Sequence, residues 1–309
     1  MTRLRDESGQ ATAMFTVFLA SLVLVVAVGA VLDAGAWFRA DRKLQANSDA
    51  AALAGAQALP DDPAAAVNLA VEYGTKNGGD VEADDVTIET TVVPNDTIAI
   101  AAERDAEGVF TPAVGIASVE VHAQAKARTG TIASALYVAP IVVNWQHAKL
   151  KCKPLPCFGE ATELTYHHLK TSGPSGPDGA GSFGFINLTN SNSPGTSELR
   201  DQILKGHDQY MDLGKYDART GNPFSAINGA LDQRIGEEML FPVYKSLTGT
   251  GATAQYEIIG WVGFVITSMN LLGTSEKLFG HFTRVIWQGI ASTSAGSPNF
   301  GAYAVELIE

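Results

Sequence analysis

The sequence predicts an α+β protein with a long N-terminal transmembrane helix, a small α/β unit after it, and a mixed, mostly antiparallel C-terminal domain. Three observations support this prediction. An uncharged apolar run lies near the N-terminus, helix-forming composition continues beyond it to Pro60, and short strand-like runs separated by Gly-rich turns dominate the remainder. The expected boundaries are residues 1–60 for a cytoplasmic head, the transmembrane helix and its extension, 61–130 for a small pilin-like α/β unit, and 131–309 for an extracytoplasmic α+β domain.

The apolar run is long enough to cross a bilayer. No charged residue occurs between Glu7 and Asp33, and Ala11–Leu32 is nearly all apolar. A bilayer core needs about 20 such residues in a helix, and a core helix of this length without a polar face is uncommon in a soluble domain. A cleaved signal, with Ala34-Gly35-Ala36 as a loose cleavage site, stays open, but its apolar region is usually shorter. We therefore expect an uncleaved anchor that contacts the lipid bilayer through residues 11–32.

Charge gives a mixed indication of orientation and argues against two classes of partner. Arg3 and Arg5 precede the apolar run, while Arg39, Arg42 and Lys43 follow it, so the positive-inside rule does not decide the topology. The net charge of −12 argues against nucleic acid or an anionic membrane surface as a partner.

The two cysteines favour an oxidising compartment for the C-terminal part. Cys152 and Cys157 stand in the segment CKPLPC and are the only cysteines of the chain. They are candidates for a small disulfide, although two unlinked thiols remain the alternative. With no further cysteine, a zinc site has little support. We expect a single-pass protein of the cell membrane whose C-terminal part is extracytoplasmic.

The helix is expected to continue past the membrane surface. Ala and Leu dominate up to Leu59, so a single helix over residues 11–59 would be about 70 Å long at 1.5 Å per residue. Trp37 and Phe38 then lie where an aromatic belt meets the interface. A stripe of mostly small residues follows on the emerging half, and it suits either an ordinary core or an assembly surface. Its members are Leu44, Ala51, Ala52 and Gly55.

The next seventy residues predict a helix and an antiparallel sheet, the arrangement of a pilin-like fold. A helix is expected from Asp62 to Lys76, and strands over 86–93, 97–102 and 119–128. The alternation in the last strand puts His122 on its solvent face.

The C-terminal part predicts further short elements. Strands are expected over 136–143, 164–169, 182–188, 256–267, 278–288 and 302–308, and helices over 196–205 and 222–235. This succession is typical of an α+β domain.

The first sixty residues also carry a specific pattern. It consists of a charged head from Arg5 to Gln10 with Gly9 near its end, the apolar span, Asp33 just beyond the span, and the run LQANSDAAALAGAQAL from Leu44 to Leu59. This pattern resembles the TadE/TadG-like proteins of the tight-adherence (Flp) pilus system. The stretches GSFGFINL, from Gly181, and NPFSAINGALDQRI, from Asn222, look loosely like those of TadG-like members. The resemblance implies work in the envelope, in building or displaying a pilus.

Two departures limit what the resemblance implies. Relatives processed like prepilins carry Glu at the fifth position after the cleavage Gly, whereas Met14 occupies that place when counted from Gly9. Cleavage and major-pilin packing are therefore in doubt. Many larger TadG-like proteins carry a von Willebrand A-type domain with an Asp-x-Ser-x-Ser metal site, and that run is absent from this sequence.

The search for catalytic motifs is mostly negative. Gly179, Gly181 and Gly184 form a Gly-x-Gly-x-x-Gly, but they follow a Pro/Gly-rich loop and precede a strand instead of a helix, so a loop end is favoured over a dinucleotide site. The adjacent His167 and His168 would point to opposite faces of a strand, which does not suit one metal ion.

An acidic turn gives one more candidate for a metal. It comprises Asp80, Glu82, Asp84 and Asp85, and it has some features of a calcium site but not the spacing of a known loop. A solvated turn is the favoured interpretation. We therefore expect no catalytic residue, no metal site and no cofactor.

The residues and the resemblance together favour a non-enzymatic, membrane-anchored component of Flp/Tad pilus assembly or a minor pilus subunit. Its partners would be other pilus-assembly or envelope proteins. The alternative is a membrane-anchored extracytoplasmic binding or sensor module, which should show a concave pocket with convergent polar groups. An anchored enzyme should add titratable groups with strongly perturbed pKa values.

Overall fold

The computed structural model describes residues 8–308 apart from 80, 154, 168, 170–178, 190–194 and 272–274, with side chains from Thr12 onward. The chain divides into two compact units. The first comprises residues 1–89, 97–127 and 307–309, and the second comprises residues 90–96 and 128–306. The predicted α+β class with a long N-terminal helix is confirmed. The predicted 1–60 and 61–130 segments lie almost wholly in the first unit.

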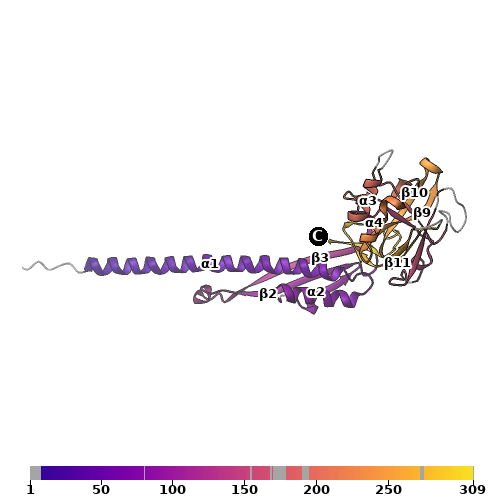
Figure 1. Ribbon diagram of the computed structural model, residues 1–309. Coiled ribbons are helices and arrows are strands. Elements are labelled where there is room, and N and C mark those ends of the chain that lie inside the picture. Colours follow the sequence, from indigo (N-terminus) through magenta and orange to yellow (C-terminus); the bar gives the residue numbers. More distant parts are fainter. Residues whose placement is uncertain are drawn as a thin grey trace, which may run out of the picture. The chain divides into compact units, whose positions relative to one another are not determined.

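The first unit combines two helices with a small sheet (Figure 1). Its helices are α1 (Ser8–Ala56) and α2 (Pro63–Asn77), followed by the short η1 (Ala83–Asp85). The strands are β1 (Val86–Glu89), β2 (Thr97–Glu107) and the first part of β3 (Ser118–Ala135), in the order β1-β2-β3, with η2 (Thr111–Val114) in the turn after β2. The β1–β2 pair is antiparallel.

Local sequence explains the limits of α2. The Asp62 carboxylate accepts a hydrogen bond from the Ala65 amide at 2.9 Å, and Pro63 occupies the first helical turn, where its missing N–H costs nothing. Gly78 ends the helix at φ 152°, a conformation that an L side chain rarely adopts.

The small-residue stripe of α1 belongs to the core of the first unit. Leu44, Ala51 and Ala52 are buried, and α1 packs on α2 and β2. At Gly55 the helices approach so closely that a Cβ would lie 2.5 Å from Ile98 Cδ1 and 2.8 Å from the Ala66 carbonyl oxygen. The stripe is therefore not an exposed assembly surface.

The second unit contains the end of β3 and all later elements except the last residues. Its helices are α3 (Thr196–Lys205) and α4 (Phe224–Gln233). Its strands are β4 (Ile141–Asn144), β5 (Thr162–Tyr166), β6 (Ser182–Phe185), β7 (Met211–Asp212), β8 (Gly214–Asp217), β9 (Glu238–Thr248), β10 (Gln255–Asn270), β11 (Lys277–Thr283), β12 (Val285–Ile286), β13 (Gly289–Ala291) and β14 (Ala302–Ile308).

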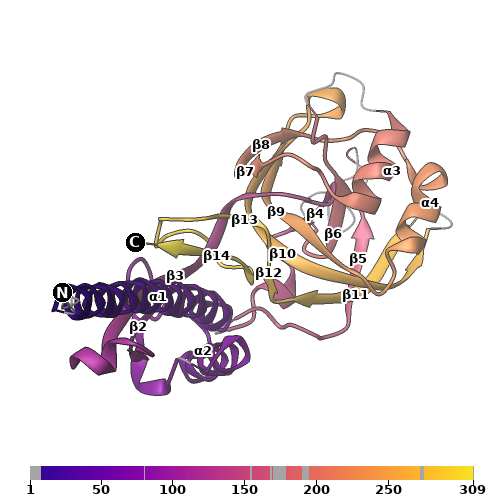
Figure 2. The same cartoon turned by 90° about the vertical axis from the view of Figure 1, so that its left-hand side faces the viewer.

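The main sheet of this unit closes on itself. Its order is β11-β5-β6-β4-β9-β10-β8, and β10 also pairs with β11, so the strands from β11 to β10 form a barrel (Figure 2). The pairs β4–β9 and β5–β6 are parallel, whereas β4–β6, β9–β10, β10–β11 and β11–β5 are antiparallel. This agrees with the expected mixed, mostly antiparallel domain. A separate group of strands joins β3 to β14, β13 and β7, and β14 to β12 in parallel.

Two apolar clusters fill the second unit. The first cluster contains buried side chains of α3 and α4, among them Leu199, Ile203 and Phe224. These pack against alternate residues of the barrel strands, such as Phe241 and Phe264. The other takes the opposite faces of the same strands, including Val142, Leu240 and Trp261. Both faces of these strands are therefore buried, which explains their nearly continuous apolar runs.

Several predicted strand limits are wrong for local reasons. The strand expected over 86–93 ends at Glu89, because the Asp96 carboxylate accepts hydrogen bonds at 2.8–3.0 Å from the amides of residues 91–93 and turns the chain there. The run 136–143 is interrupted at Tyr137, whose φ is 53°, and β4 begins only at Ile141. The run 278–288 divides into β11 and β12, which pair with different strands.

Candidate functional site

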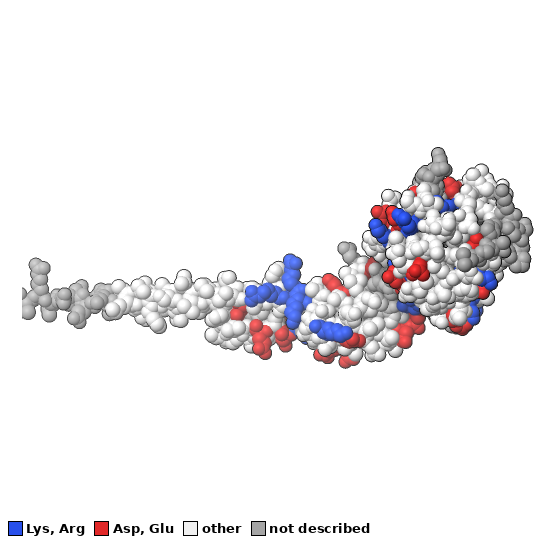
Figure 3. All heavy atoms as spheres, viewed as in Figure 1, with Lys and Arg blue, Asp and Glu red and all other residues white. Residues whose placement is uncertain are grey.

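The apolar half of α1 is exposed along its length. The large side chains from Met14 to Leu32 are about half to three-quarters accessible, and α1 is long and apolar enough to cross a membrane. Figure 3 shows this part of the helix without charged atoms. Met14, at the place where processed relatives carry Glu, is itself one of the exposed side chains. Such a surface on a helix calls for an apolar environment around it.

The exposed half of α1 ends at Asp33, which binds the turn after β2. Asp33 Oδ1 accepts a hydrogen bond from the Val109 amide at 3.0 Å, and Oδ2 accepts from the amides of Phe110 at 2.8 Å and Thr111 at 2.7 Å. The carboxylate is only 2% exposed. Three converging N–H groups stabilise a negative charge in the way that an N-terminal helix turn does. Asp33 therefore fixes the turn to the helix.

One turn earlier on α1, Gly29 makes room for the same segment. A Cβ at Gly29 would lie 2.7 Å from Phe110 Cβ and 2.9 Å from Phe110 Cγ, so a larger residue would displace this ring. Gly29 and Asp33 are four residues apart and thus share one face of the helix. Together Gly29 and Asp33 form the contact surface of α1 on which η2 packs.

Beyond Asp33 the helix becomes polar. The Arg42 guanidinium lies 5.0 Å from the ring centre of Phe38, which remains exposed, whereas Trp37 is half-buried. Gln45 Nε2 donates to the Gln124 carbonyl oxygen at 2.8 Å and so ties α1 to β3 within the first unit. Aromatic and basic side chains in this order are typical of the end of a membrane span.

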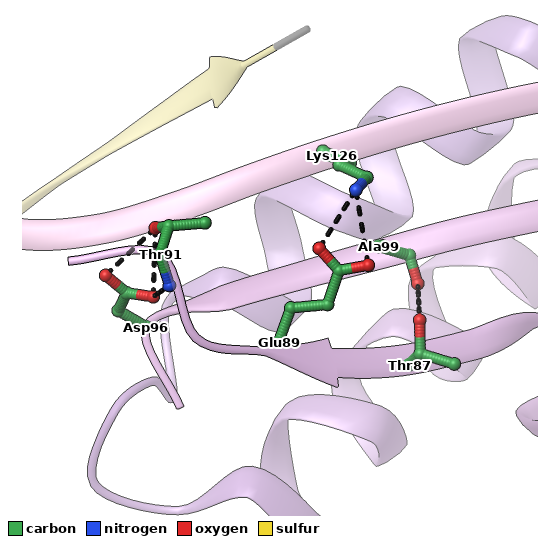
Figure 4. A network of polar contacts seen from close by, with 6 residues as sticks. All are labelled: Thr87, Glu89, Thr91, Asp96, Ala99 and Lys126. Atoms are coloured by element: carbon green, nitrogen blue, oxygen red, sulfur yellow. Dashed lines mark hydrogen bonds and ion pairs between the residues drawn. The ribbon is translucent and has the colours of Figure 1, made fainter. Parts of the chain in front are cut away.

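Polar contacts hold the sheet of the first unit together. Lys126 Nζ lies 2.9 Å from Glu89 Oε2, and the Thr87 hydroxyl donates to the Ala99 carbonyl oxygen at 3.4 Å (Figure 4). These are cross-strand contacts on partly exposed surface, which stabilise the sheet modestly.

The predicted acidic turn has a structural role. Asp85 Oδ2 accepts from the Glu82 amide at 2.8 Å and pairs with Arg104 Nη2 at 2.7 Å. Asp80 lies outside the described residues. A carboxylate already bonded to a cation and an amide is a poor calcium ligand, so the turn is explained by η1 and its ion pair.

One group on the neighbouring strands has metal-ligating residue types that sequence reasoning did not bring together. Glu103 of β2 lies 3.4 Å from His122 of β3, and Glu120 lies 3.8 Å from the other ring nitrogen of this histidine. These three side chains could hold one ion by distance, yet all are exposed. Only the β2–β3 register reveals the group. His122 faces solvent, as its strand pattern indicated.

In the second unit the two cysteines form a disulfide. Cys152 and Cys157 are joined with their Cα atoms 5.6 Å apart, next to η3 (Ala148–Leu150). The Lys151 ammonium stands 4.6 Å from the ring centre of Trp145. A cavity of about 600 Å³ adjoins this segment, and it combines an apolar lining with three lysines. Its lining residues are Trp145, Leu150, Lys151, Lys153, Lys245, Ile259, Pro298, Asn299 and Phe300.

One member of the candidate histidine pair is a core residue. His167 is buried, with Nε2 2.5 Å from the Tyr256 hydroxyl, while His168 lies outside the described residues. Glu163, the nearby carboxylate, pairs with Lys277 at 2.6 Å. Burial raises the pKa of Tyr256 well above its usual range, so this group is a neutral hydrogen-bonding core residue.

The glycine motif and the other shifted groups also belong to the fold. Gly184 lies in β6, and the chain from Gly179 runs into that strand without the helix that a dinucleotide phosphate requires. Burial raises the pKa of Tyr166 to about 12 and lowers the pKa of His147 and of His207. In each case burial is the largest cause, which is typical of core residues.

The first unit thus defines a class of protein, namely one with a single N-terminal helix able to span a membrane and an antiparallel sheet packed on the extension of that helix. Residues 9–58 match the model of the family described as "Putative Flp pilus-assembly TadE/G-like", which covers α1 from its first turns to the end of the stripe. This match confirms the resemblance in this segment and supports involvement in the Flp pilus system. No curated protein and no solved structure matches the chain significantly.

Proposed function

We propose that this protein is a membrane-anchored, non-catalytic component of Flp pilus assembly, acting as an assembly anchor or as a minor pilus subunit. The observation that carries the proposal is the TadE/G-like match over residues 9–58, which coincides with the exposed apolar helix and its packed extension. In this proposal the apolar half of α1 lies in the cell membrane, and the part of the first unit beyond Asp33 lies outside the cytoplasm together with the second unit.

The packing of α1 supports a mechanical role. The same helix forms the apolar exposed segment and, beyond Leu44, the core of the first unit. The helix contains no proline, the commonest cause of a sharp kink, and a long helix without a kink curves only gently. The sheet is therefore rigidly coupled to the anchor, and a force or a contact on one reaches the other. A structural subunit works through contacts of this kind, with pilus or envelope proteins as partners.

The location of the disulfide is consistent with the proposed topology. Cys152 and Cys157 belong to the second unit, and disulfides persist in oxidising compartments outside the cytoplasm. Labelling intact cells with a membrane-impermeant reagent at an introduced exposed cysteine, such as Tyr210→Cys, measures this topology. Labelling only after cell lysis would overturn the extracytoplasmic placement.

The role in the pilus is tested by deletion and by fractionation. Deleting the gene should abolish surface filaments and adherence, and the wild-type gene should restore both. Gentle shearing of living cells, followed by blotting of released filaments and washed membranes, distinguishes the two roles. Presence in the filaments identifies a minor subunit, and retention in the membrane identifies an anchor. Normal filaments in the deletion strain would overturn the proposal.

A binding or sensor module is the second candidate, and the cavity beside the disulfide favours it. Trp145, Ile259 and Phe300 give this cavity an apolar lining, while Lys151, Lys153 and Lys245 add positive charge. Such a site suits an apolar ligand with an anionic group.

Charge reversal in this cavity separates the two candidates. The variant Lys153→Glu, Lys245→Glu should leave filaments intact if the protein works through α1 and the first unit. A pair of exposed lysines elsewhere, Lys205→Glu, Lys215→Glu, is the matched control. Loss of filaments in the cavity variant alone would favour the binding module.

A further inference from the structure

The turn between β2 and β3 has the composition of a membrane-contacting segment. The turn (residues 108–117) and the first two residues of β3 include no charged side chain, although Glu107 and Glu120 flank this run. Val109 is 77% exposed, Val114 57%, Ile116 48% and Phe110 47%. Surface turns are normally polar, and a group of exposed apolar side chains at one tip marks a binding surface.

The position of this tip beside α1 identifies what covers it. Phe110 packs on Gly29, and Asp33 holds the amides of residues 109–111. Figure 1 shows this turn lying along α1. At 1.5 Å per residue, Gly29 lies about 26 Å along the helix from Thr12 and about 4–5 Å before the end of the apolar segment. If residues 11–32 fill a hydrocarbon core of about 30 Å, the tip meets the outer boundary of that core.

Many backbone amides of the tip form hydrogen bonds within the protein and do not depend on water. The Gly108 amide donates to the Ala117 carbonyl oxygen at 2.9 Å, and the amides of Ala113, Gly115 and Ile116 donate to carbonyls within the tip at 3.1–3.2 Å. Asp33 accepts the amides of residues 109–111, and Pro112 has no amide hydrogen. Unsatisfied backbone groups are what excludes most loops from lipid. Internal satisfaction of these groups removes much of that cost.

From these observations we infer that the β2–β3 tip is a second membrane contact, which dips into the outer interface of the bilayer beside α1. Asp33 and Gly29 position it there, and its exposed valine, phenylalanine and isoleucine side chains contact acyl chains. The partner is a lipid surface, continuous with the one around α1. This inference rests on the proposed membrane anchoring of α1, and the test separates the two.

The test places nitroxide spin labels on the full chain in vesicles of phosphatidylethanolamine and phosphatidylglycerol. Because the two native cysteines are joined, a single introduced cysteine accepts the label. Val114→Cys reports the tip, and Val23→Cys reports the span. Tyr73→Cys is a control at an exposed aromatic position of α2, which is 41% accessible against 57% for Val114. The measured quantity is the ratio of two collision rates of the nitroxide: that with oxygen, which partitions into lipid, and that with a water-soluble nickel chelate.

We expect this ratio to be several-fold higher at positions 114 and 23 than at position 73. Adding Asp33→Asn to Val114→Cys should lower the ratio at 114 toward that at 73, because the tip is released from the helix. A ratio at 114 equal to that at 73, with a high ratio at 23, would overturn the tip contact and leave the anchoring intact. A low ratio at 23 would overturn both. A label at 114 that is immobilised without oxygen preference would indicate a protein partner and also overturn the lipid contact.

Discussion

The closest helix crossing in the first unit provides a test of the proposed rigid coupling between α1 and its sheet. At Gly55 a Cβ would meet both Ile98 Cδ1, at 2.5 Å, and the Ala66 carbonyl oxygen, at 2.8 Å. The first of these atoms ends a buried side chain, and the second belongs to the backbone of α2. Gly55→Val must therefore push α2 away from α1.

The expected loss follows from two opposing effects. Overpacking a buried contact typically costs about 1–3 kcal/mol. Replacing Gly by Val in a helix returns only about 0.3–0.4 kcal/mol of intrinsic preference. The net destabilisation of the first unit should therefore be about 1–3 kcal/mol. Such a loss raises the exchange rate of amides that open with the unit by roughly 5- to 150-fold, since a factor of ten corresponds to about 1.4 kcal/mol.

Hydrogen exchange of the full chain in detergent micelles measures this effect, with the protected amides of α2 and β2 as probes. Gly35→Val is the matched control, because it makes the same substitution in the same helix at a position where a Cβ meets nothing within 4 Å. It should leave these rates unchanged or slow them slightly. Equal rates in Gly55→Val and the wild type, or equal acceleration in both variants, would refute the packing argument.

Three further predictions concern other contacts. Asp33→Asn should accelerate proteolysis at residues 108–117 but not in α2, because the new amide NH₂ faces a backbone N–H donor and cannot accept its hydrogen bond. Unchanged cleavage would show that Asp33 does not fix this turn to α1. Reducing the Cys152–Cys157 disulfide should lower the unfolding free energy of the second unit by about 2 kcal/mol, because the unfolded chain is then no longer constrained by a closed six-residue loop. Guanidinium unfolding with and without reductant measures this loss, and the double variant Cys152→Ser, Cys157→Ser, which has no disulfide, should not respond to reductant. Burial lowers the pKa of His147 below 6.5, so its contribution to stability is present above pH 6.5 and is lost as pH falls further. His147→Gln should flatten the pH dependence of the melting temperature between pH 5 and 7. An unchanged slope would show that His147 does not cause this pH dependence.

Elements with strong local signals were predictable from the sequence. The long helix followed from an uncharged run and helix-forming residues, and α2 followed from Asp62-Pro63 at its start and Gly78 at its end. Strand limits were less accurate, because their ends depend on contacts that composition does not encode. The Asp96 carboxylate stops β1 through three backbone amides, and amides carry no residue signature.

The closure of the barrel could not be read from the sequence either. It depends on β10 pairing with β9 at one edge and with β8 and β11 at the other, and that register is set by the whole unit. The stripe on α1 could be read two ways, since small buried residues look alike in a core and in an interface. The burial of Leu44, Ala51 and Ala52, and the close contact of Gly55 with α2, assign the stripe to the core.

The two parts of the candidate site could be recognised in the sequence, but their contact could not be predicted from it. The TadE/G-like pattern includes Asp33, and the run 108–119 contains no charged residue, but nothing in the sequence connects the two across more than seventy residues. The connection explains both features. A buried aspartate is costly unless its charge is satisfied, and backbone amides removed from water are costly unless an acceptor binds them. If the apolar half of α1 spans the membrane as we propose, this pairing explains how an aspartate is accommodated at the membrane boundary, because the turn binds its charge.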